Sequence, residues 1–350
     1  MISYDITQFG APLQRSERPT PAPEGTEVVL RVKAAGVCHS DVHIHEGYFD
    51  LGGGKKISMK ERGMKLPHTL GHETVGEVAA LGPDAKGVER GARYLVYPWI
   101  GCGTCGVCRA GEEQLCMAPR FIGVQRAGGY ADHIVVPHPR YLLDIGAMPA
   151  AIAAPYACSG LTSYSALKKL GTMLEREAVV IIGAGGLGLQ AIGIHKALKG
   201  RAAVAVDIDP AKRAAALEAG AAAAIDGAAS DAIAQIKAAA GGQVWSVIDL
   251  VGSPQTAQLG IDCLSKGGRY IIVGLFGGAI TLPLPILPQR ALTIQGSYTG
   301  SLGELKELLE LVRRAHIEPI PTAEVPLAEA NATLERLRAG KIVGRAVLTA

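Results

Sequence analysis

The sequence predicts an α/β protein with two domains, one rich in β-strands and one built as a doubly wound parallel sheet. Three observations support this fold class. A chain of 350 residues is longer than one hydrophobic core usually accommodates. Over the first ~150 residues, runs such as EVVLRVKAAGV and TVGEVAALG mix β-branched residues with glycine breaks, as strands and turns do. From residue ~160 onward, apolar runs alternate with alanine-rich helical runs, which predicts right-handed β–α–β units.

The expected elements follow the chain in this order. The opening prolines predict an extended edge strand or a loop: Pro12, Pro19, Pro21 and Pro23. Strands are expected over residues 27–37, 74–82, 178–184, 202–208, 244–252 and 267–275, and helices over 187–199 and 210–220. After residues 292–300 the pattern reverts to a Leu/Glu-rich helix over 304–314, a proline break, another helix and a final strand over 344–350. We therefore predict that a domain of residues 156–296 is inserted into one formed by residues 1–155 and 297–350.

Charge and hydropathy argue against several classes of protein. The formal net charge is only +3 and no long run carries one sign, so the sequence indicates neither a nucleic-acid surface nor a basic membrane patch. No uninterrupted apolar stretch reaches the ~18 residues that a membrane span needs. The opening residues MISYDITQFG lack the basic and apolar regions of a signal peptide, so we expect a cytoplasmic protein with no membrane partner.

Four cysteines form a C-x2-C-x2-C-x7-C run within a short glycine-rich segment: Cys102, Cys105, Cys108 and Cys116. Four thiolates at this spacing suit a tetrahedral Zn²⁺ ion, whose bonds to sulfur are about 2.3 Å long. Such a closed shell leaves no coordination position for a substrate, so we expect a structural zinc. A disulfide pair or a redox switch is the alternative, and the lack of a secretory signal disfavours it.

The run GAGGLG over residues 183–188 follows the apolar residues AVVII and opens a helix, which is the setting that a dinucleotide-binding motif requires. Gly183 permits the tight turn, Gly185 lets the backbone approach a pyrophosphate, and Gly188 lets the helix pack closely on the strand. Asp207 ends the next strand, where its carboxylate can accept both hydroxyls of an adenosine ribose and would repel a 2′-phosphate. The motif therefore predicts NAD rather than NADP, and a glycine-rich turn of an unrelated α/β fold is the alternative.

Other chemically suggestive residues have simpler structural interpretations. Asp209 and Pro210 are expected to be the N-cap and first turn of a helix. Lys212 is expected either near the adenosine ribose or simply at the surface, and Cys263 is expected to be a buried apolar residue. Six histidines outside any motif are expected on the surface or on helices rather than at a metal: His45, His68, His133, His138, His195 and His316.

Three segments far apart in the sequence carry further potential metal ligands: residues 36–43 (GVCHSDVH), 71–73 (GHE) and 158–162 (CSGLT). Two thiolates and one imidazole would make a zinc site whose fourth position is open to water or an alcohol. With these segments, the cysteine run and the glycine motif in this order and spacing, the chain resembles the zinc-dependent medium-chain alcohol dehydrogenases over essentially its whole length. The resemblance implies a GroES-like catalytic domain, with a zinc lobe at about residues 98–118, and a Rossmann cofactor domain.

The resemblance also implies roles for individual residues at the open site. Cys38, His72 and Cys158 would be the ligands of a catalytic zinc. Glu73 would lie behind the metal or bind it transiently, and Asp41 would orient the ring of His72.

Proton transfer and cofactor binding follow from the same resemblance. Ser40 would bond the alcohol oxygen and pass its proton, through the cofactor ribose, toward His43. Trp99 is expected to line the substrate cleft or to pack in the core. Cofactor contacts are expected from His39, Thr162, Gly183, Gly185, Gly186, Leu187, Gly188, Asp207, Lys212, Val251, Val273, Leu275 and Arg345, the last reaching the phosphates.

We therefore expect an NAD-dependent zinc alcohol dehydrogenase with two Zn²⁺ ions per chain, one catalytic and one structural. It would transfer hydride reversibly between NAD(H) and the zinc-bound alkoxide of a primary or secondary alcohol, giving an aldehyde or ketone. The resemblance implies a homotetramer, or else a homodimer. The alternatives are a zinc-dependent polyol dehydrogenase, an NADP-preferring carbonyl reductase, a non-catalytic zinc- and NAD(P)H-binding relative, and a zinc-ribbon interaction or nucleic-acid module.

The sequence departs from the family pattern between Cys38 and His72, which are separated by 33 residues, more than the family commonly has. The excess is expected within residues 46–66, a flexible glycine-rich turn followed by a basic stretch with a net charge of +2 over the segment. Its basic residues are Lys55, Lys56, Lys60, Arg62 and Lys65. This segment is expected to be a lid that shapes specificity, or else a solvated or subunit-contacting loop.

Overall fold

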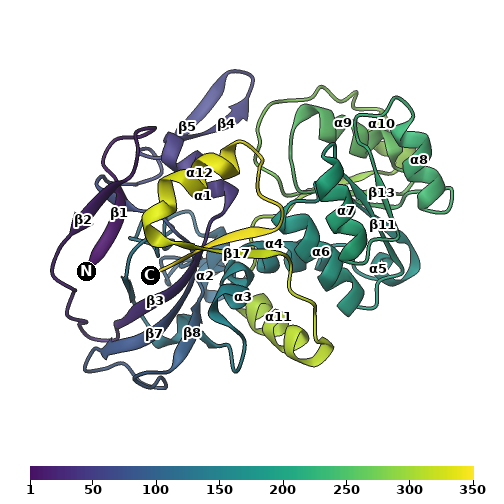
Figure 1. Cartoon of the computed structure of the whole chain (residues 1–350). Coiled ribbons are helices and arrows are strands. Elements are labelled where there is room, and N and C mark those ends of the chain that lie inside the picture. Colours follow the sequence, from purple (N-terminus) through teal and green to yellow (C-terminus); the bar gives the residue numbers. More distant parts are fainter.

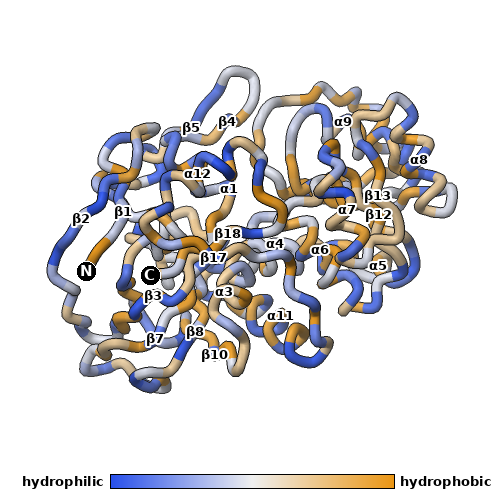
Figure 2. The backbone as a smooth tube through the Cα atoms, in the orientation of Figure 1, coloured by the Kyte–Doolittle hydropathy of each residue, from blue (hydrophilic) through white to orange (hydrophobic).

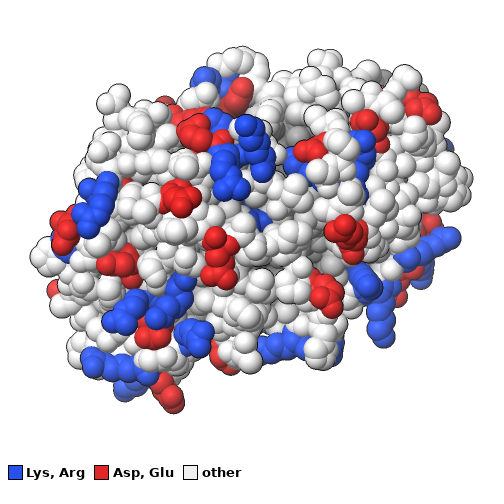
Figure 3. All heavy atoms as spheres, viewed as in Figure 1, with Lys and Arg blue, Asp and Glu red and all other residues white.

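The computed structural model describes residues 1–350 and has two lobes (Figure 1). The first and last parts of the chain, purple to blue and yellow in Figure 1, share one lobe, and the green middle part forms the other. No helix combines the length and the apolar character needed to cross a bilayer. Basic and acidic side chains are interspersed over the face seen in Figure 3, as the small net charge leads one to expect.

A seven-stranded sheet organises the first lobe. Its order is β10-β8-β7-β3-β18-β17, and β9 also pairs with β3. The strands are β3 (Val28–Gly36), β7 (Glu73–Leu81), β8 (Arg93–Val96), β9 (His133–Val136), β10 (Leu142–Asp144), β17 (Thr322–Pro326) and β18 (Arg345–Thr349). Residues Val347 and Leu348 of β18 pair antiparallel with Gly36 and Ala35, so the last strand of the chain lies inside this sheet, between β3 and β17.

A smaller sheet has the order β2-β1-β6 and consists of β1 (Ile2–Ile6), β2 (Gln14–Glu17) and β6 (His68–Thr69). β2 is an edge strand beside the proline-rich opening segment, as the sequence predicts. Figure 2 shows β2 as one of the hydrophilic outer segments, in contrast to the hydrophobic strands of the second lobe.

The second lobe has a six-stranded sheet in which every pair is parallel, with the order β13-β12-β11-β14-β15-β16. Its strands are β11 (Ala178–Ile182), β12 (Ala202–Val206), β13 (Ala223–Ile225), β14 (Ser246–Asp249), β15 (Arg269–Ile272) and β16 (Thr293–Gly296). The connecting helices include α6 (Gly186–Ala197), α7 (Pro210–Glu218), α8 (Ala232–Ala239) and α9 (Pro254–Cys263). The order reverses direction after β11, which is the doubly wound arrangement that the strand–helix alternation predicts.

The alternation of side chains along β11 explains why this sheet is covered on both faces. Val179 and Ile181 belong to the large apolar cluster that contains α6, whereas Val180 and Ile182 belong to a second cluster with α8 and α9. Successive side chains of a strand point to opposite faces, so a run of five apolar residues needs a partner on each side. An uninterrupted apolar run such as AVVII therefore predicts a parallel strand that is buried on both faces.

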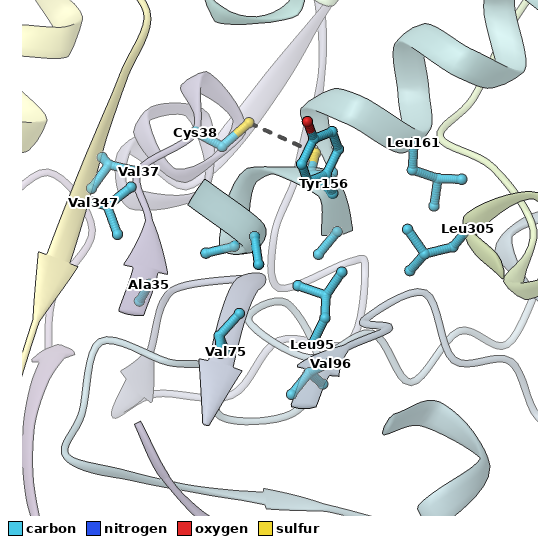
Figure 4. Close-up of a cluster of buried hydrophobic side chains, with 14 of the residues drawn as sticks. Ala35, Val37, Cys38, Val75, Leu95, Val96, Tyr156, Leu161, Leu305 and Val347 are labelled. Atoms are coloured by element: carbon cyan, nitrogen blue, oxygen red, sulfur yellow. Dashed lines mark hydrogen bonds between the residues drawn. The ribbon is translucent and has the colours of Figure 1, made fainter. Parts of the chain in front are cut away.

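Eight further helices belong to the two lobes or lie between them. They are α1 (His39–Glu46), α2 (Gly106–Arg109), α3 (Ala150–Ala153), α4 (Ser159–Lys168), α5 (Met173–Arg176), α10 (Ile286–Arg290), α11 (Leu302–Ala315) and α12 (Ala330–Arg338). Helix α4 packs against α6 of the second lobe and against α11. The large apolar cluster therefore runs from the first lobe into the second without a break, and Figure 4 shows a part of it around Cys38, Tyr156 and Leu305.

The segment expected as a flexible lid or loop is an ordered hairpin. It consists of β4 (Tyr48–Gly52) and β5 (Lys55–Ser58), followed by a turn up to Gly63. The hairpin stands at the top of the first lobe in Figure 1, and Gly52 lies against the backbone carbonyl of Gly278 in the second lobe. The segment thus touches both lobes at the edge of the space between them.

Candidate functional site

A cleft of about 330 Å³ lies between the lobes and takes its lining from both. The first lobe contributes the end of β3, helix α1 and the start of α4, whereas the second contributes the loops after β11, β12, β14 and β15. The carboxyl ends of parallel strands, on either side of the point where strand order reverses, form a crevice in doubly wound sheets. The cleft is therefore placed where this fold normally binds a ligand.

Four candidate metal ligands meet in the wall of this cleft. The ligand atoms of Cys38, His72, Glu73 and Cys158 all lie within 4.8 Å of one another, and all four residues are buried. The sulfurs of Cys38 and Cys158 are 3.9 Å apart, which is the dashed contact in Figure 4. The fold brings them together because Cys38 follows β3 and His72 precedes its neighbour β7, while Cys158 begins α4.

A glycine at position 36 makes room for this arrangement. A Cβ atom at Gly36 would overlap Oε2 of Glu73, the residue opposite it in the β3–β7 pairing. Any side chain at this position would therefore displace the Glu73 carboxylate from the cluster. Gly36 is therefore needed for packing, because only glycine leaves space for the Glu73 carboxylate, whereas Cys38 in the same motif supplies a potential ligand.

Asp41 fixes both Cys38 and His72. Its Oδ1 accepts a hydrogen bond from Nδ1 of His72 at 3.1 Å, and its Oδ2 accepts from the backbone N–H of Cys38 at 3.0 Å and from the Tyr130 hydroxyl at 3.1 Å. The Nε2 atom of His72 is buried and has no partner. A carboxylate on one ring nitrogen sets the tautomer and presents the other nitrogen to a metal.

The charges of the cluster depend on one another. Burial alone would lower the pKa of His72, but the Asp41 carboxylate and Cys38 raise it well above its ordinary value. A hydrogen bond from Cys158 outweighs burial and holds the pKa of the Cys38 thiol well below its ordinary value. A readily ionised thiol beside an unpartnered imidazole nitrogen is a donor set that suits Zn²⁺.

Glu73 lies behind the sulfurs and is held by Arg345. Its Oε1 accepts hydrogen bonds from Nη2 of Arg345 at 2.8 Å and from the backbone N–H of Ser159 at 3.2 Å, whereas its Oε2 has no partner. Burial raises the pKa of Glu73 to about 7, although Arg345 opposes this. Arg345 is only 4% exposed, and its guanidinium lies between Glu73 and Gly186 at the start of α6. The residue expected to reach the cofactor phosphates thus also neutralises Glu73.

The second cysteine cluster is compact and lies outside the cleft. Its ligand atoms lie within 4.8 Å of one another, and the sulfur of Cys105 is 3.4 Å from that of Cys108 and 3.8 Å from that of Cys116. Sulfurs at the corners of a tetrahedron with bonds of 2.3 Å would be about 3.8 Å apart. All seven cysteines of the chain are free thiols, and backbone N–H groups of Cys102 and Ala118 donate to the Cys116 sulfur. These distances fit a four-sulfur zinc site and do not fit disulfides.

The glycine motif forms the other half of the cleft. Gly183 has a φ of +95°, and a Cβ atom at Gly188 would overlap the carbonyl oxygen of Gly183, so helix α6 begins directly against the turn. No atom lies within 4 Å of a Cβ placed on Gly185, the N-cap of α6, so this backbone is open to a ligand. An open loop at the start of a long helix suits the pyrophosphate of a dinucleotide.

Asp207 stands beside this loop. Its Oδ2 accepts a hydrogen bond from the backbone N–H of Ala184 at 2.8 Å, and its Oδ1 accepts from that of Asp209 at 2.9 Å. The carboxylate is therefore held in place at the cleft wall. Asp209 caps α7 through the N–H of Ala211, as the sequence predicts.

The structure places all the predicted cofactor contacts in the lining of one cleft, namely His39, Thr162, Gly183, Gly185, Gly186, Leu187, Gly188, Asp207, Lys212, Val251, Val273, Leu275 and Arg345. Ser40, His43 and Trp99 also line it, whereas Asp41 and Glu73 are fully buried and do not line it. The hydroxyl of Thr162 is buried without a partner, and Nε1 of Trp99 donates to the carbonyl of Ala157 at 3.0 Å.

Sequence reasoning missed part of the lining. Phe49, Arg62, Val124 and Tyr298 line the cleft but belong to no motif. A basic or aromatic residue in a hairpin or turn carries no spacing signal, so only the fold reveals where it points.

The histidines outside the motifs do not join a metal cluster, as expected. His45 on α1 and His195 on α6 are buried but lie on helices, as predicted, whereas His68 is buried on strand β6 and lies neither on the surface nor on a helix. His45 is held by the carbonyl of Ala11 at 2.7 Å, and burial lowers the pKa of His195 to about 4. Cys263 is fully buried at the end of α9, as predicted.

Comparison with known proteins agrees with this geometry. The family model "Alcohol dehydrogenase GroES-like domain" matches residues 24–147, and "Zinc-binding dehydrogenase" matches residues 186–314. The chain belongs to the zinc-type medium-chain dehydrogenase/reductase family. Two members named NAD-dependent alcohol dehydrogenase, from Sulfurisphaera tokodaii and Saccharolobus solfataricus, are 37% and 36% identical over 99% of both chains.

A solved structure of this family gives the same picture. The alcohol dehydrogenase of Aeropyrum pernix is 31% identical, covers 100% of both chains and has a TM-score of 0.89. The predicted fold class, a GroES-like domain with a Rossmann parallel sheet, is therefore confirmed.

Proposed function

We propose that this dehydrogenase oxidises primary or secondary alcohols with NAD, and reduces the corresponding aldehydes or ketones, using Cys38, His72 and Cys158 to hold a catalytic zinc. The observation that carries the proposal is the pair of unpartnered buried atoms, Nε2 of His72 and an oxygen of Glu73, beside two thiols in the wall of a dinucleotide-type cleft. When bound, zinc supplies a Lewis acid that favours loss of the alcohol proton, and NAD supplies the hydride acceptor. We propose a second, structural zinc at the four-cysteine cluster.

The chain's own residues would position the alcohol and move its proton. Ser40 lines the cleft at the start of α1, two residues after Cys38, and would bond the alcohol hydroxyl. Burial lowers the pKa of His43, so its ring is neutral at neutral pH and can accept a proton. No direct hydrogen bond joins Ser40 to His43, so the relay needs a bridging hydroxyl, and the cofactor ribose would provide it.

The function is tested by a spectrophotometric assay of NADH formation with an alcohol series, together with zinc analysis of the purified protein. We expect NADH formation with primary or secondary alcohols and two zinc ions per chain. Ser40→Ala should lower kcat strongly while both zinc ions stay bound. Absence of NADH formation with every alcohol tested would contradict the proposed function, and an unchanged kcat of Ser40→Ala at all pH values would contradict the relay.

We predict that Asp207 sets the preference for NAD. In Asp207→Ser, loss of a charge-assisted hydrogen bond to the ribose should lower the ratio of kcat/KM for NAD over NADP by about 10- to 100-fold. Asp209→Ser is the matched control, because serine also caps a helix and Asp209 does not line the cleft. If Asp207→Ser lowered kcat/KM equally with both cofactors, Asp207 would act only by holding the glycine loop.

We propose a homotetramer in which the β16 edge takes part in a subunit contact. All four residues of this edge strand are exposed, including the apolar Ile294 at 41%. An exposed apolar sheet edge is a template for pairing with a second copy. Ile294→Lys on β16 should convert the tetramer to a smaller species by light scattering, and an unchanged mass would contradict this contact.

A further inference from the structure

Arg62 is a cation in the cleft wall that has no anionic partner. Its Nη2 lies 3.5 Å from the hydroxyl of Tyr298, and its guanidinium carbon lies 5.2 Å from the centre of the Phe49 ring. No carboxylate lies within ion-pair distance of it, although twelve other basic side chains or histidines of the chain are so paired. A guanidinium that faces a cleft with one long hydrogen bond and no carboxylate beside it is suited to bind an anion.

The backbone that carries Arg62 is fixed. The side chains of Met59 and Met64, on either side of it, are buried, and Ser58 and Glu61 hydrogen-bond each other's backbone N–H groups across the turn. The carbonyl of Arg62 accepts a hydrogen bond from Nε2 of Gln125 at 3.0 Å. Arg62 is thus delivered to the cleft by an ordered turn rather than by a freely moving loop.

An aromatic wall connects Arg62 with the metal ligands. The ring of Trp99 is 5.3 Å from that of His72 and 6.4 Å from that of Tyr298, whose hydroxyl in turn meets Arg62. Phe49 and Val124 line the same part of the cleft. A molecule bound at His72 and extending along this wall would have an apolar middle and would end at the guanidinium.

The other charged residues of the cleft either form an ion pair or lie in its cofactor half. Arg345 pairs with Glu73, and Asp207 and Lys212 lie at the cofactor half, on β12's end and on α7. Arg62 is therefore the one unpaired guanidinium in the part of the cleft that an alcohol would occupy. One planar guanidinium balances the single charge of a carboxylate and matches its two oxygens, whereas a phosphate ester carries more charge than it can neutralise.

We propose that Arg62 binds a terminal carboxylate of the substrate, so that the preferred substrates are hydroxycarboxylic acids whose hydroxyl and carboxylate are separated by a chain of methylene groups. This inference rests on the proposed alcohol dehydrogenase function. In the reaction, the alcohol carbon gives a hydride to NAD⁺ and the hydroxyl gives up its proton, which yields an aldehyde, NADH and H⁺. The carboxylate only fixes the position of the substrate and is unchanged.

The test compares two substrate series of equal chain lengths, ω-hydroxycarboxylates and unbranched 1-alkanols. The wild type should have a higher kcat/KM for at least one hydroxycarboxylate than for the alkanol of the same length. In Arg62→Leu the ratio of kcat/KM between acid and alkanol should fall by about 10- to 100-fold, mainly through KM. Arg62→Lys should retain part of the preference, because it keeps the charge but not the planar pair of donors.

Lys60→Leu is the matched control, because it removes the same charge from the same turn at an exposed position outside the cleft. It should leave both series unchanged, which separates binding by Arg62 from attraction by the basic segment as a whole. A wild type that oxidises alkanols with no preference for the acids, or an Arg62→Leu variant with an unchanged ratio, would overturn this proposal alone. A wild type that oxidises neither series would contradict the alcohol dehydrogenase function as well.

Discussion

Replacing Cys158 with serine is expected to lower kcat by at least ~10³-fold, because several kcal/mol of transition-state stabilisation depend on a metal held at this site. Cys158 and Cys38 lie 3.9 Å apart, and serine is a poor replacement for a thiolate ligand of zinc. The zinc content should fall from the proposed two ions to one per chain. NADH formation and elemental analysis on the same sample would measure both effects.

The control for this variant is Cys263→Ser. Cys263 is also fully buried, and its sulfur already donates to the carbonyl of Gly260 at 3.2 Å, a bond that a serine hydroxyl can make. It lies in neither ligand cluster, so both zinc content and kcat should be retained. If Cys158→Ser kept two zinc ions and a kcat within tenfold of the wild type, the assignment of the catalytic site would be wrong.

Replacing Cys105 with serine is expected to act on stability rather than on chemistry. The lobe around Cys102–Cys116 has little secondary structure beyond the short helix α2, so its shape depends on what its four sulfurs bind. Loss of a ligand of the proposed structural zinc should lower the free energy of unfolding by roughly 3–5 kcal/mol. Denaturant unfolding followed by fluorescence would measure this difference, and kcat measured at low temperature should change by less than tenfold.

Val107→Ala provides the comparison within the same lobe. Val107 is 37% exposed between two of the cysteines and carries no ligand atom, so its removal should cost well under 1 kcal/mol. Equal losses of stability in Cys105→Ser and Val107→Ala would show that the lobe tolerates the loss of its metal. A Cys105→Ser protein that is stable but inactive would contradict a purely structural role.

The parts of the fold that are local in sequence could be predicted closely. The apolar run AVVII predicts β11, and the glycine motif directly after it predicts the start of α6. Both patterns consist of residues that are adjacent in the sequence. β13 and β17 were not predicted, since short strands in alanine- or proline-containing segments have weak periodicity. Their existence depends on neighbouring strands that lie elsewhere in the chain.

The site shows the same division. The candidate metal ligands Cys38, His72 and Cys158 could be predicted because each stands in a distinctive motif. The ion pair between Arg345 and Glu73 joins residues that are 272 positions apart, and no local sequence pattern predicts it. Likewise, the sequence favours residues 46–66 as a lid or a loop, but nothing in it distinguishes Arg62, which lines the cleft, from the other basic residues of the segment. Long-range contacts of this kind come from sheet topology rather than from motifs.

The position of β18 has a consequence for how the protein folds. The strand inserts between β3 and β17 and carries Arg345, so the first lobe cannot complete its sheet until a strand that follows the whole second lobe in the sequence has paired with β3. Until then β3 has an unfilled edge, and the Glu73 carboxylate has no counterion. Pairing across such sequence distances is slow to form. The end of the cleft that holds the candidate metal ligands should therefore be among the last parts of the molecule to form.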